Sequence, residues 1–157
     1  MPQRRDRRSR FSAEPTVLVV DDEETPRSLA CRLVRALGYQ ARAARDGREA
    51  LRHLQHHPGE VRLVLADLVM PYMDGAELGE RARDLQPRLP VVLMSSKPQG
   101  DAAELVAAYP EFPFLEKPLT TEALYRVLTQ LLGPSPASRG RRANDRVHYR
   151  DRARQPS

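Results

Sequence analysis

The sequence lacks several features that define disulfide-stabilised and membrane proteins. Its 157 residues include no tryptophan and one cysteine, and aromatic residues make up 5% of the chain. A single cysteine excludes an intramolecular disulfide framework, so Cys31 is predicted to be a small buried hydrophobic residue. No apolar run approaches the roughly 20 residues of a membrane-spanning helix. No apolar stretch follows the arginine-rich start, so no secretory signal is expected and we predict a soluble, cytoplasmic protein.

The net charge of +5 is distributed unevenly along the chain. The N-terminal arm (residues 1–15) has five arginines and two acidic residues, and the C-terminal arm (residues 134–157) has seven arginines and two acidic residues. Residues 16–133 hold 14 basic and 17 acidic groups. Both arms are rich in Arg, Ser, Pro and Gly and poor in aliphatic residues, so they cannot bury enough surface to fold alone. We predict one mildly acidic domain over residues 16–133, between two disordered basic arms.

Short apolar runs alternate with segments of helical periodicity throughout this domain. Strands are predicted over residues 16–20, 39–44, 61–66, 90–94 and 112–115. A helix is predicted after each strand, with start signals at Thr25-Pro26, Asp46-Gly47, Asp74, Asp101 and Thr120. Such alternation predicts an α/β fold with a parallel sheet and helices on both faces.

Residues able to do chemistry follow four of the five predicted strands. Asp21 and Asp22 follow the first strand, Asp67 the third and Ser95 the fourth, and Lys117 lies just after the fifth. The carboxyl ends of parallel strands form the usual ligand-binding edge of an open α/β sheet. The sequence therefore predicts a cluster of three carboxylates, one hydroxyl and one ammonium at this edge.

This combination of groups indicates a metal-assisted phosphoryl-transfer site. Clustered carboxylates repel one another unless a divalent cation and a lysine offset their charge. All the candidate ligands are oxygens and no histidine is near, which favours Mg²⁺, or Mn²⁺, over zinc. The lysine is unusual here, because the chain has 24 arginines and only two lysines. A metal and an ammonium would neutralise phosphoryl oxygens while a carboxylate attacks.

Each candidate also has a simpler structural interpretation. Residues 21–24 could be a solvated acidic helix entry, Asp67 and Ser95 turn residues, and Lys117 a surface lysine. Asp74 is interpreted only as a helix cap. No Ser-His-Asp set, P-loop or dinucleotide fingerprint is present. The histidines are interpreted as solvated residues, neither ligands nor a phosphorelay site: His53, His56, His57 and His148.

Five motifs follow one another in a characteristic order. They are VLVVDDE (17–23), LVLADLVMPYMDG (63–75), PVVLMSS (90–96), FLEKPL (114–119) and TTEAL (120–124). Successive spacings from Asp22 to Asp67, Ser95 and Lys117 are 45, 28 and 22 residues. Together these motifs resemble the receiver domain of two-component response regulators. The resemblance implies a doubly wound, flavodoxin-like fold, with five helices and five parallel strands in the order 2-1-3-4-5.

The resemblance implies an acceptor residue and a metal site. Asp67 would accept a phosphoryl group from a histidine kinase or a phosphotransfer protein. Asp22 and Asp67 would ligate Mg²⁺, with Asp21 binding directly or through water. The backbone carbonyl of Val69 would complete the protein ligands.

Three further residues are implied in the response to phosphorylation. Ser95, the switch hydroxyl, would bond one phosphoryl oxygen and Lys117 would pair with another. Phe114 stands at the position of the switch aromatic. The new anion would draw Ser95 inward and open space for Phe114. The implied output face comprises the fourth helix, fifth strand and fifth helix, where phosphorylation-dependent dimerisation is one expected outcome.

Val69 departs from the family pattern at one functional position. Many fast-hydrolysing receivers carry a polar side chain two residues after the phosphoacceptor. Valine cannot orient an attacking water, so we predict slow autodephosphorylation. A haloacid-dehalogenase-like phosphatase would need an aspartate at this same position, and Val69 does not match.

The residues after Gly133 show no apolar periodicity and match no helix-turn-helix or catalytic domain. We therefore predict a single-domain response regulator of the chemotaxis-regulator type, which signals through protein–protein contacts to a partner that the sequence does not name. We expect no enzyme activity beyond its own phosphorylation from small phosphodonors and its own dephosphorylation. A receiver module related to those of hybrid kinases is a close alternative. Another is a receiver-fold scaffold that binds nucleic acid through its arginine-rich arms, which are otherwise explained as solubilising tails.

Overall fold

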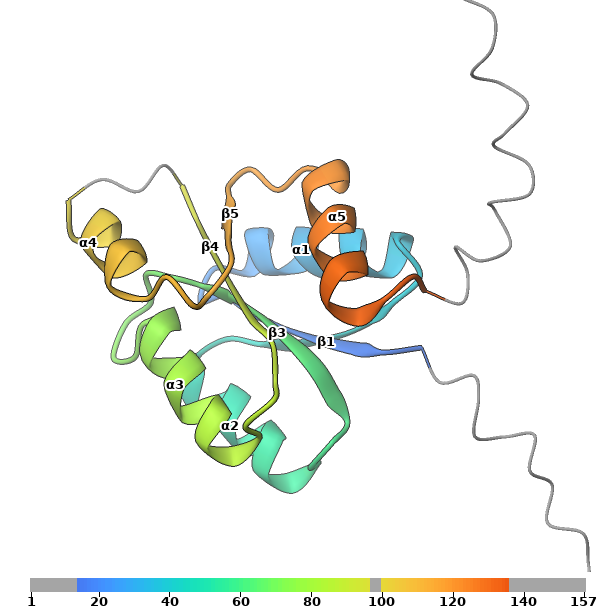
Figure 1. Ribbon diagram of the computed structural model, residues 1–157, viewed down its shortest axis with the longest axis horizontal. Coiled ribbons are helices and arrows are strands. Elements are labelled where there is room, and N and C mark those ends of the chain that lie inside the picture. Colours follow the sequence, from blue (N-terminus) through green and yellow to red (C-terminus); the bar gives the residue numbers. More distant parts are fainter. Residues whose placement is uncertain (1–13, 97–99, 136–157) are drawn as a thin grey trace, which may run out of the picture.

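The computed structural model describes residues 14–96 and 100–135, which form a five-stranded parallel sheet between two layers of helices (Figure 1). The strands are β1 (Thr16–Val20), β2 (Gln40–Ala44), β3 (Val61–Asp67), β4 (Val91–Ser95) and β5 (Phe114–Glu116). The helices are α1 (Glu24–Ala36), α2 (Gly47–His56), α3 (Gly75–Leu85), α4 (Asp101–Ala108) and α5 (Thr121–Leu132). The strand order is β2-β1-β3-β4-β5, which confirms the predicted doubly wound, flavodoxin-like fold.

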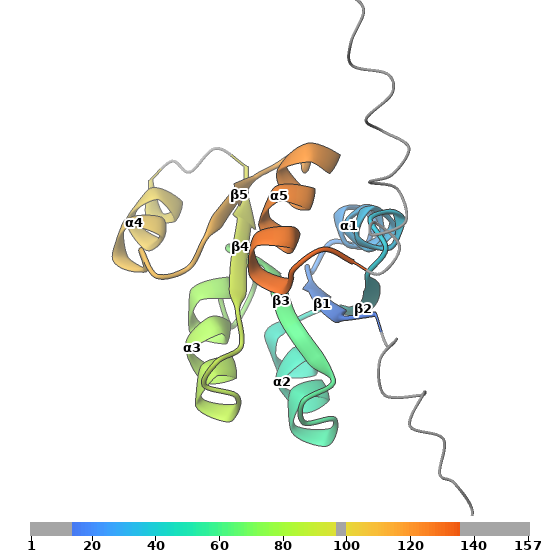
Figure 2. The same cartoon turned by 45° about the vertical axis from the view of Figure 1, so that its right-hand side comes forward.

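An apolar cluster lies on each face of the sheet. Alternate side chains of a strand point to opposite faces, so Val17 and Val19 pack with α1 and α5, whereas Leu18 and Val20 pack on the other face. Helices α2, α3 and α4 cover that second face, and Figure 2 shows α1 and α5 across the strands from α2 and α3. Cys31 lies on the buried face of α1, as predicted. Within the described residues, no helix is long and apolar enough to cross a membrane.

Side-chain caps fix three helix starts at the predicted residues. The carboxylates of Asp46 and Asp74 each accept a hydrogen bond of 2.8 Å from a backbone N–H three residues later. The Thr120 hydroxyl accepts the equivalent bond from the Ala123 N–H at 3.1 Å. Each bond satisfies a backbone donor that has no partner within the helix. Asp74 is therefore a helix cap, as the sequence indicated.

Helix α1 begins earlier than predicted. The sequence placed its cap at Thr25, but the helix starts at Glu24 and its N-cap residue is Glu23. The Asp21 carboxylate accepts a 3.0 Å hydrogen bond from the Glu23 N–H, so the chain already turns directly after β1. Pro26 becomes the third helical residue, where its missing N–H interrupts no helical bond.

Strand β5 begins later than predicted. The sequence placed its start at residue 112, but pairing with β4 starts at Phe114. Phe112 is instead a buried core residue, and the Arg83 guanidinium carbon lies 4.5 Å from its ring centroid. Pro113 has no N–H to donate to a strand ladder, although its carbonyl accepts a bond from Leu93.

The chain folds back against the start of β2 after α5. The Tyr39 hydroxyl donates a 2.8 Å hydrogen bond to the Gly133 carbonyl, and the Ser135 hydroxyl donates one of 3.0 Å to the Leu37 carbonyl. Ser135 is buried, although the sequence assigned it to the C-terminal arm. The prediction of disorder otherwise concerns residues 1–13 and 136–157, which lie outside the described part of the chain.

Replacing Tyr39 with phenylalanine is expected to lower the free energy of unfolding by about 1 kcal/mol. The variant keeps the buried ring but removes the hydrogen bond to the Gly133 carbonyl. Urea denaturation measures the change. Tyr125→Phe is the control, because this ring is 37% exposed, and its effect should be under about 0.5 kcal/mol. Equal effects of the two substitutions would contradict the stabilising role of the Tyr39 hydroxyl.

Candidate functional site

Three aspartates meet at the carboxyl ends of β1 and β3. Asp21 and Asp22 follow β1 directly, and Asp67 is the last residue of β3. Ligand oxygens of the three carboxylates lie within 4.8 Å of one another. Asp21 is fully buried, Asp67 is 9% exposed and Asp22 is exposed. The structure thus brings together the three acidic residues that the strand-end argument selected.

Lys117 reaches into this cluster from the loop after β5. Its ammonium donates a 2.8 Å hydrogen bond to Asp21 Oδ2 and lies 3.4 Å from Asp67 Oδ1. The Lys117 backbone N–H donates a 2.7 Å bond to the Ser95 carbonyl, which ties this loop to the end of β4. One ammonium therefore contacts two of the three carboxylates.

The electrostatic balance of the cluster remains negative. Burial raises the pKa of Asp67 to about 6, the nearby Lys117 ammonium opposes this shift, and the charges of Asp21 and Asp22 add to it. Burial by itself would lower the pKa of Lys117, but the hydrogen bond to Asp21 and the charge of Asp67 outweigh burial and raise it. Lys117 is therefore held in its charged form, and its single positive charge is outnumbered by the three carboxylates of the cluster.

Ser95 and Phe114 lie on the two strands beyond Asp67. Asp67 pairs with Met94 in the β3–β4 register, so Ser95 is one residue further along β4. Ser95 is buried, and it is the last residue of β4. Phe114 begins β5 and packs, partly buried, against the apolar cluster that α4 also covers. The predicted hydroxyl therefore borders the acidic cluster, and the predicted aromatic lies on the face of the sheet that α4 also covers.

The loop between β3 and α3 depends on a glycine whose role the sequence analysis missed. The Gly75 N–H donates a 2.8 Å hydrogen bond to the Leu68 carbonyl. A Cβ at Gly75 would overlap the backbone carbonyl of Asp67, so only glycine lets α3 start this close to the acidic cluster. The sequence signal was a glycine directly after a capping aspartate, at the end of the motif over residues 63–75. Val69 lies on the same loop with its side chain 58% exposed.

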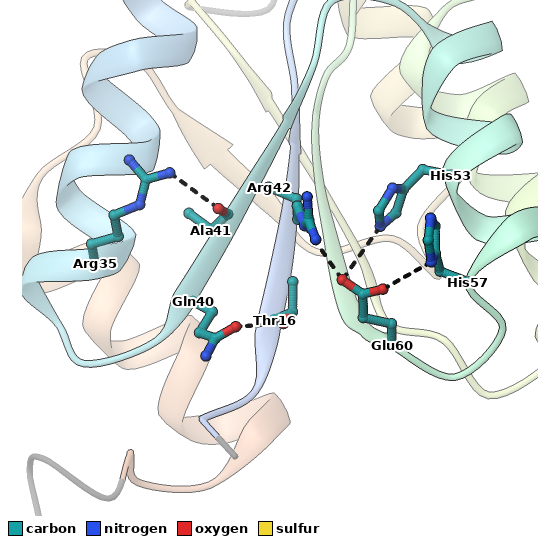
Figure 3. A network of polar contacts seen from close by, with 8 residues as sticks. All are labelled: Thr16, Arg35, Gln40, Ala41, Arg42, His53, His57 and Glu60. Atoms are coloured by element: carbon teal, nitrogen blue, oxygen red, sulfur yellow. Dashed lines mark hydrogen bonds and ion pairs between the residues drawn. The ribbon is translucent and has the colours of Figure 1, made fainter.

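The histidines lie elsewhere, and one interpretation of them is wrong. His53 Nε2 lies 3.8 Å from a carboxylate oxygen of Glu60, too far for a hydrogen bond, and His57 Nδ1 lies 3.4 Å from the other oxygen (Figure 3). Arg42 pairs with the same carboxylate at 3.3 Å. The His53 side chain is only 17% exposed and burial lowers its pKa, so it is not a solvated residue. His148 lies outside the described residues.

This histidine cluster is well separated from the aspartates. Glu60 precedes β3, whereas Asp67 ends it, and seven strand residues separate the two ends by roughly 20 Å. The imidazoles therefore cannot join the acidic cluster as ligands, which agrees with the all-oxygen set that the sequence predicted.

The fold and this cluster define a doubly wound α/β domain with three carboxylates and one ammonium at the carboxyl edge of its sheet. The family model described as the response regulator receiver domain matches residues 17–129, and the chain belongs to this family. Receiver domains of two-component systems accept phosphoryl groups, and they are signalling domains rather than classical enzymes. They bind Mg²⁺ at an acidic pocket and interact with histidine kinases or phosphotransfer proteins.

Curated relatives contain this domain as a small part of a longer chain. The chain is 33% identical over 122 residues to the sensor kinase CckA of Brucella abortus, covering 78% of this chain and 13% of that protein. It is 36% identical over 121 residues to the transcriptional regulatory protein GlrR of Escherichia coli, covering 76% of this chain and 26% of that protein. This chain therefore belongs to the same family as one domain of each of these proteins. Both proteins are much longer than this chain.

The chain matches solved structures of receiver-domain proteins over nearly the whole length of those structures. The chemotaxis protein CheY4 of Vibrio cholerae has a TM-score of 0.67 at 27% identity, with 76% of this chain and 100% of that chain covered. The receiver domain of the hybrid histidine kinase CckA has a TM-score of 0.62 at 33% identity, covering 74% and 98% of the two chains. Both a chemotaxis protein and a kinase module thus share this fold.

Proposed function

We propose that this chain acts as a response regulator in which Asp67 accepts a phosphoryl group in a Mg²⁺-dependent reaction. The observation that carries this assignment is that Asp21 and Asp67 differ in their hydrogen bonds and in their burial. Both carboxylate oxygens of Asp21 are engaged, one by the Glu23 N–H and the other by Lys117, and the residue is fully buried. Asp67 is partly accessible and lies beside the same ammonium. Of the two carboxylates that contact the Lys117 ammonium, Asp67 is therefore the better placed to act as a nucleophile.

The phosphoryl donor is a phosphohistidine of a kinase or phosphotransfer protein. A carboxylate oxygen of Asp67 attacks the phosphorus, the phosphorus–nitrogen bond breaks, and its electron pair returns to the imidazole of the donor. Lys117 offsets the negative charge on the phosphoryl oxygens. The pocket between α1 and the loop after β5 holds about 340 Å³ and offers a partly apolar contact surface beside Lys117.

The acidic cluster fits the magnesium ion that the family binds. Its three carboxylates offer oxygens within 4.8 Å of one another, and oxygen is the ligand that Mg²⁺ prefers. Asp21, Asp22 and Asp67, with the backbone carbonyl of Val69, are the residues that would hold it; Mn²⁺ suits the same donors. Bound there, the cation supplies further charge neutralisation for the phosphoryl group.

Phosphorylation then changes a surface that a partner protein binds. The Ser95 hydroxyl bonds the new anion, and the space it leaves admits the Phe114 ring. Phe114 packs on the side of the sheet that α4 covers, so its movement alters the face formed by α4, β5 and α5. Signalling follows from protein–protein contacts at this face, with dimerisation as one form of contact.

Intact mass spectrometry after incubation with acetyl phosphate tests the function. One phosphoryl group should be added in the presence of Mg²⁺ and none after chelation of the metal. Asp67→Asn should abolish the addition, and Asp74→Asn is the matched control. Asp74 lies on the same loop but caps α3, and asparagine is an equally good cap. Phosphorylation of the Asp67→Asn protein, or none of the wild type, would refute the assignment.

Slow loss of the phosphoryl group is expected because Val69 cannot orient water. Its side chain is 58% exposed on the loop after Asp67. Val69→Asn is expected to shorten the half-life of the phosphorylated protein about tenfold or more, since misplacement of a reacting water has effects of this size. Mass spectrometry over time measures both decays. A wild-type half-life of seconds that Val69→Asn leaves unchanged would contradict this prediction.

A further inference from the structure

The end of helix α2 presents two histidines to one carboxylate. His53 and His57 are four residues apart, which places both rings on the same side of the helix, with their centroids 4.7 Å apart. The Glu60 carboxylate lies 3.8 Å from His53 Nε2 through one oxygen and 3.4 Å from His57 Nδ1 through the other. Figure 3 shows the three side chains directed toward one another. Two imidazoles and a carboxylate thus meet between the end of α2 and the start of β3.

One ring nitrogen of this group has no protein partner. His53 Nε2 is buried, and among the described side chains it is a polar nitrogen that makes no hydrogen bond. Buried polar atoms in proteins are nearly always paired. A buried imidazole nitrogen that faces a carboxylate without a hydrogen bond is therefore a marker of ligand binding.

The spacing of the group suits a tetrahedral metal ion. Ligand atoms that share one zinc ion lie about 3.4 Å from one another, and imidazole rings that share it have centroids roughly 5 Å apart. The separations of 3.4 and 3.8 Å from the Glu60 oxygens, and of 4.7 Å between the rings, are close to these values. The His57 side chain is 52% exposed, so its ring can turn to complete the set and the ion can enter from solvent.

We propose that His53, His57 and Glu60 bind one Zn²⁺ ion. Imidazole nitrogen suits zinc, whereas Mg²⁺ prefers sets made of oxygen alone. Two histidines and a glutamate are a known zinc donor set in proteins, in which water takes the fourth position. The site differs in chemistry from the acidic cluster, where all the side-chain donors are oxygens.

Arg42 competes with the metal for the same carboxylate. Its Nε lies 3.3 Å from Glu60 Oε1, the oxygen that also faces His53. The Arg42 side chain is 58% exposed, so the guanidinium can move into solvent when the ion binds. Two cations beside one carboxylate repel each other. Removal of the Arg42 charge should therefore strengthen zinc binding, whereas loss of an ion pair that merely holds Glu60 in place should weaken it.

Zinc at this site ties the end of α2 to the turn before β3. His53 lies in the last turn of α2, His57 is its C-cap residue, and Glu60 directly precedes β3. Because folding brings these residues together, the ion should bind the folded state and stabilise it. Asp67 lies at the opposite end of β3, so the inference is independent of the proposed phosphoryl chemistry.

Isothermal titration of the full-length protein with Zn²⁺ tests the proposal, with excess Mg²⁺ present to occupy the acidic cluster. One ion per chain should bind with a dissociation constant of about 10 µM or below, because three ligands hold zinc more weakly than the four of structural sites. His53→Gln, His57→Gln and Glu60→Gln should each weaken binding about 100-fold or more, since loss of a ligand exceeds the cost of losing an outer partner. Zinc should raise the urea midpoint of the wild type and of none of these three variants.

Matched variants serve as controls. His56→Gln removes a neighbouring imidazole whose Nδ1 lies 2.7 Å from the Arg52 carbonyl, and it should leave the affinity unchanged. Arg42→Gln should strengthen binding about threefold or more. Arg126→Gln makes the same charge change on α5, on the opposite face of the sheet, and should have no effect. Labelling by acetyl phosphate should be unchanged in every variant, so failure of zinc binding and failure of phosphorylation are distinguishable.

Three results would overturn the proposal. One is the absence of zinc binding by the wild type, or zinc binding that survives all three ligand substitutions. Another is a loss in His56→Gln equal to that in His57→Gln, because any histidine near the end of α2 would then serve. The third is weaker binding by Arg42→Gln. The exposed His57 side chain can be replaced without disturbing the core, so its variant decides the question even where the buried His53 variant folds poorly.

Discussion

A Lys117→Met variant is expected to lose about 3 kcal/mol or more of unfolding free energy in Mg²⁺-free buffer, together with its phosphorylation by acetyl phosphate. Lys117 neutralises a buried carboxylate: its ammonium donates to Asp21 at 2.8 Å, and Asp21 is fully buried. Methionine fills the same volume but leaves that charge unpaired in a dry environment. Breaking one side of a buried ion pair is among the most destabilising single changes in a protein.

Two comparisons isolate the charge of Lys117 from its packing. Lys117→Arg keeps a cation and should lose less stability, although its planar guanidinium fits an ammonium site poorly. Arg126→Met breaks an exposed helical ion pair with Glu122 and should cost less than about 0.5 kcal/mol. Chemical denaturation measures all three. A Lys117→Met protein as stable as the Arg126→Met protein would contradict the view that this ammonium holds the cluster together.

In the metal-free protein, titration of the Asp67 carboxyl is expected to contribute more stability as the pH falls from about 7 to about 4. Burial, with the neighbouring carboxylates, raises the pKa of Asp67 from 3.8 to about 6. The folded state therefore binds this proton more tightly than the unfolded state does, and protonation favours folding. This contribution to stability is fully present below the pKa that Asp67 has in the unfolded state. It is lost as the pH rises through the pKa that Asp67 has in the folded state. A shift of about two pKa units corresponds to a penalty of up to about 3 kcal/mol at pH 7.

Removal of the Asp67 charge should abolish this pH dependence. Asp67→Asn is expected to be more stable than the wild type at pH 7 by up to about 3 kcal/mol, with the difference vanishing near pH 4. Urea denaturation of both proteins over this pH range gives the difference directly, which cancels the titration of all other groups. Asp74→Asn is the control for replacing a carboxylate by an amide on the same loop, because Asp74 caps α3 outside the cluster. A difference between Asp67→Asn and wild type that stays constant with pH would refute the prediction.

The fold could be predicted because its signals are local. Alternating apolar runs gave the strands, and side-chain caps at Asp46, Asp74 and Thr120 gave three helix starts. The acidic cluster also followed from a local rule, since chemistry-bearing residues at strand ends must meet at one edge of a parallel sheet. Here the topology converts positions far apart in the sequence into neighbours, as the ion pair between Asp21 and Lys117 shows.

Features that depend on contacts between distant segments could not be predicted. The overlap that forbids a side chain at Gly75 exists only once α3 lies against the end of β3. Burial of Ser135 depends on a bond to a residue 98 positions earlier. His53 lies on a polar stretch of sequence, but its ring packs against that of His57 and lies beside Glu60, so its side chain is only 17% exposed. In each case the sequence contains the residue but no local signal of its partner.

Localisation of the phosphoryl group on the wild-type protein tests the central claim most directly. The protein is phosphorylated with acetyl phosphate and Mg²⁺, reduced with borohydride, which converts an acyl phosphate to a stable alcohol, and digested for tandem mass spectrometry. The account predicts that Asp67 is the modified residue and that the modification disappears when Mg²⁺ is omitted. A phosphoryl group on Ser95 or on a histidine such as His57, or no modification in the presence of Mg²⁺, would contradict it.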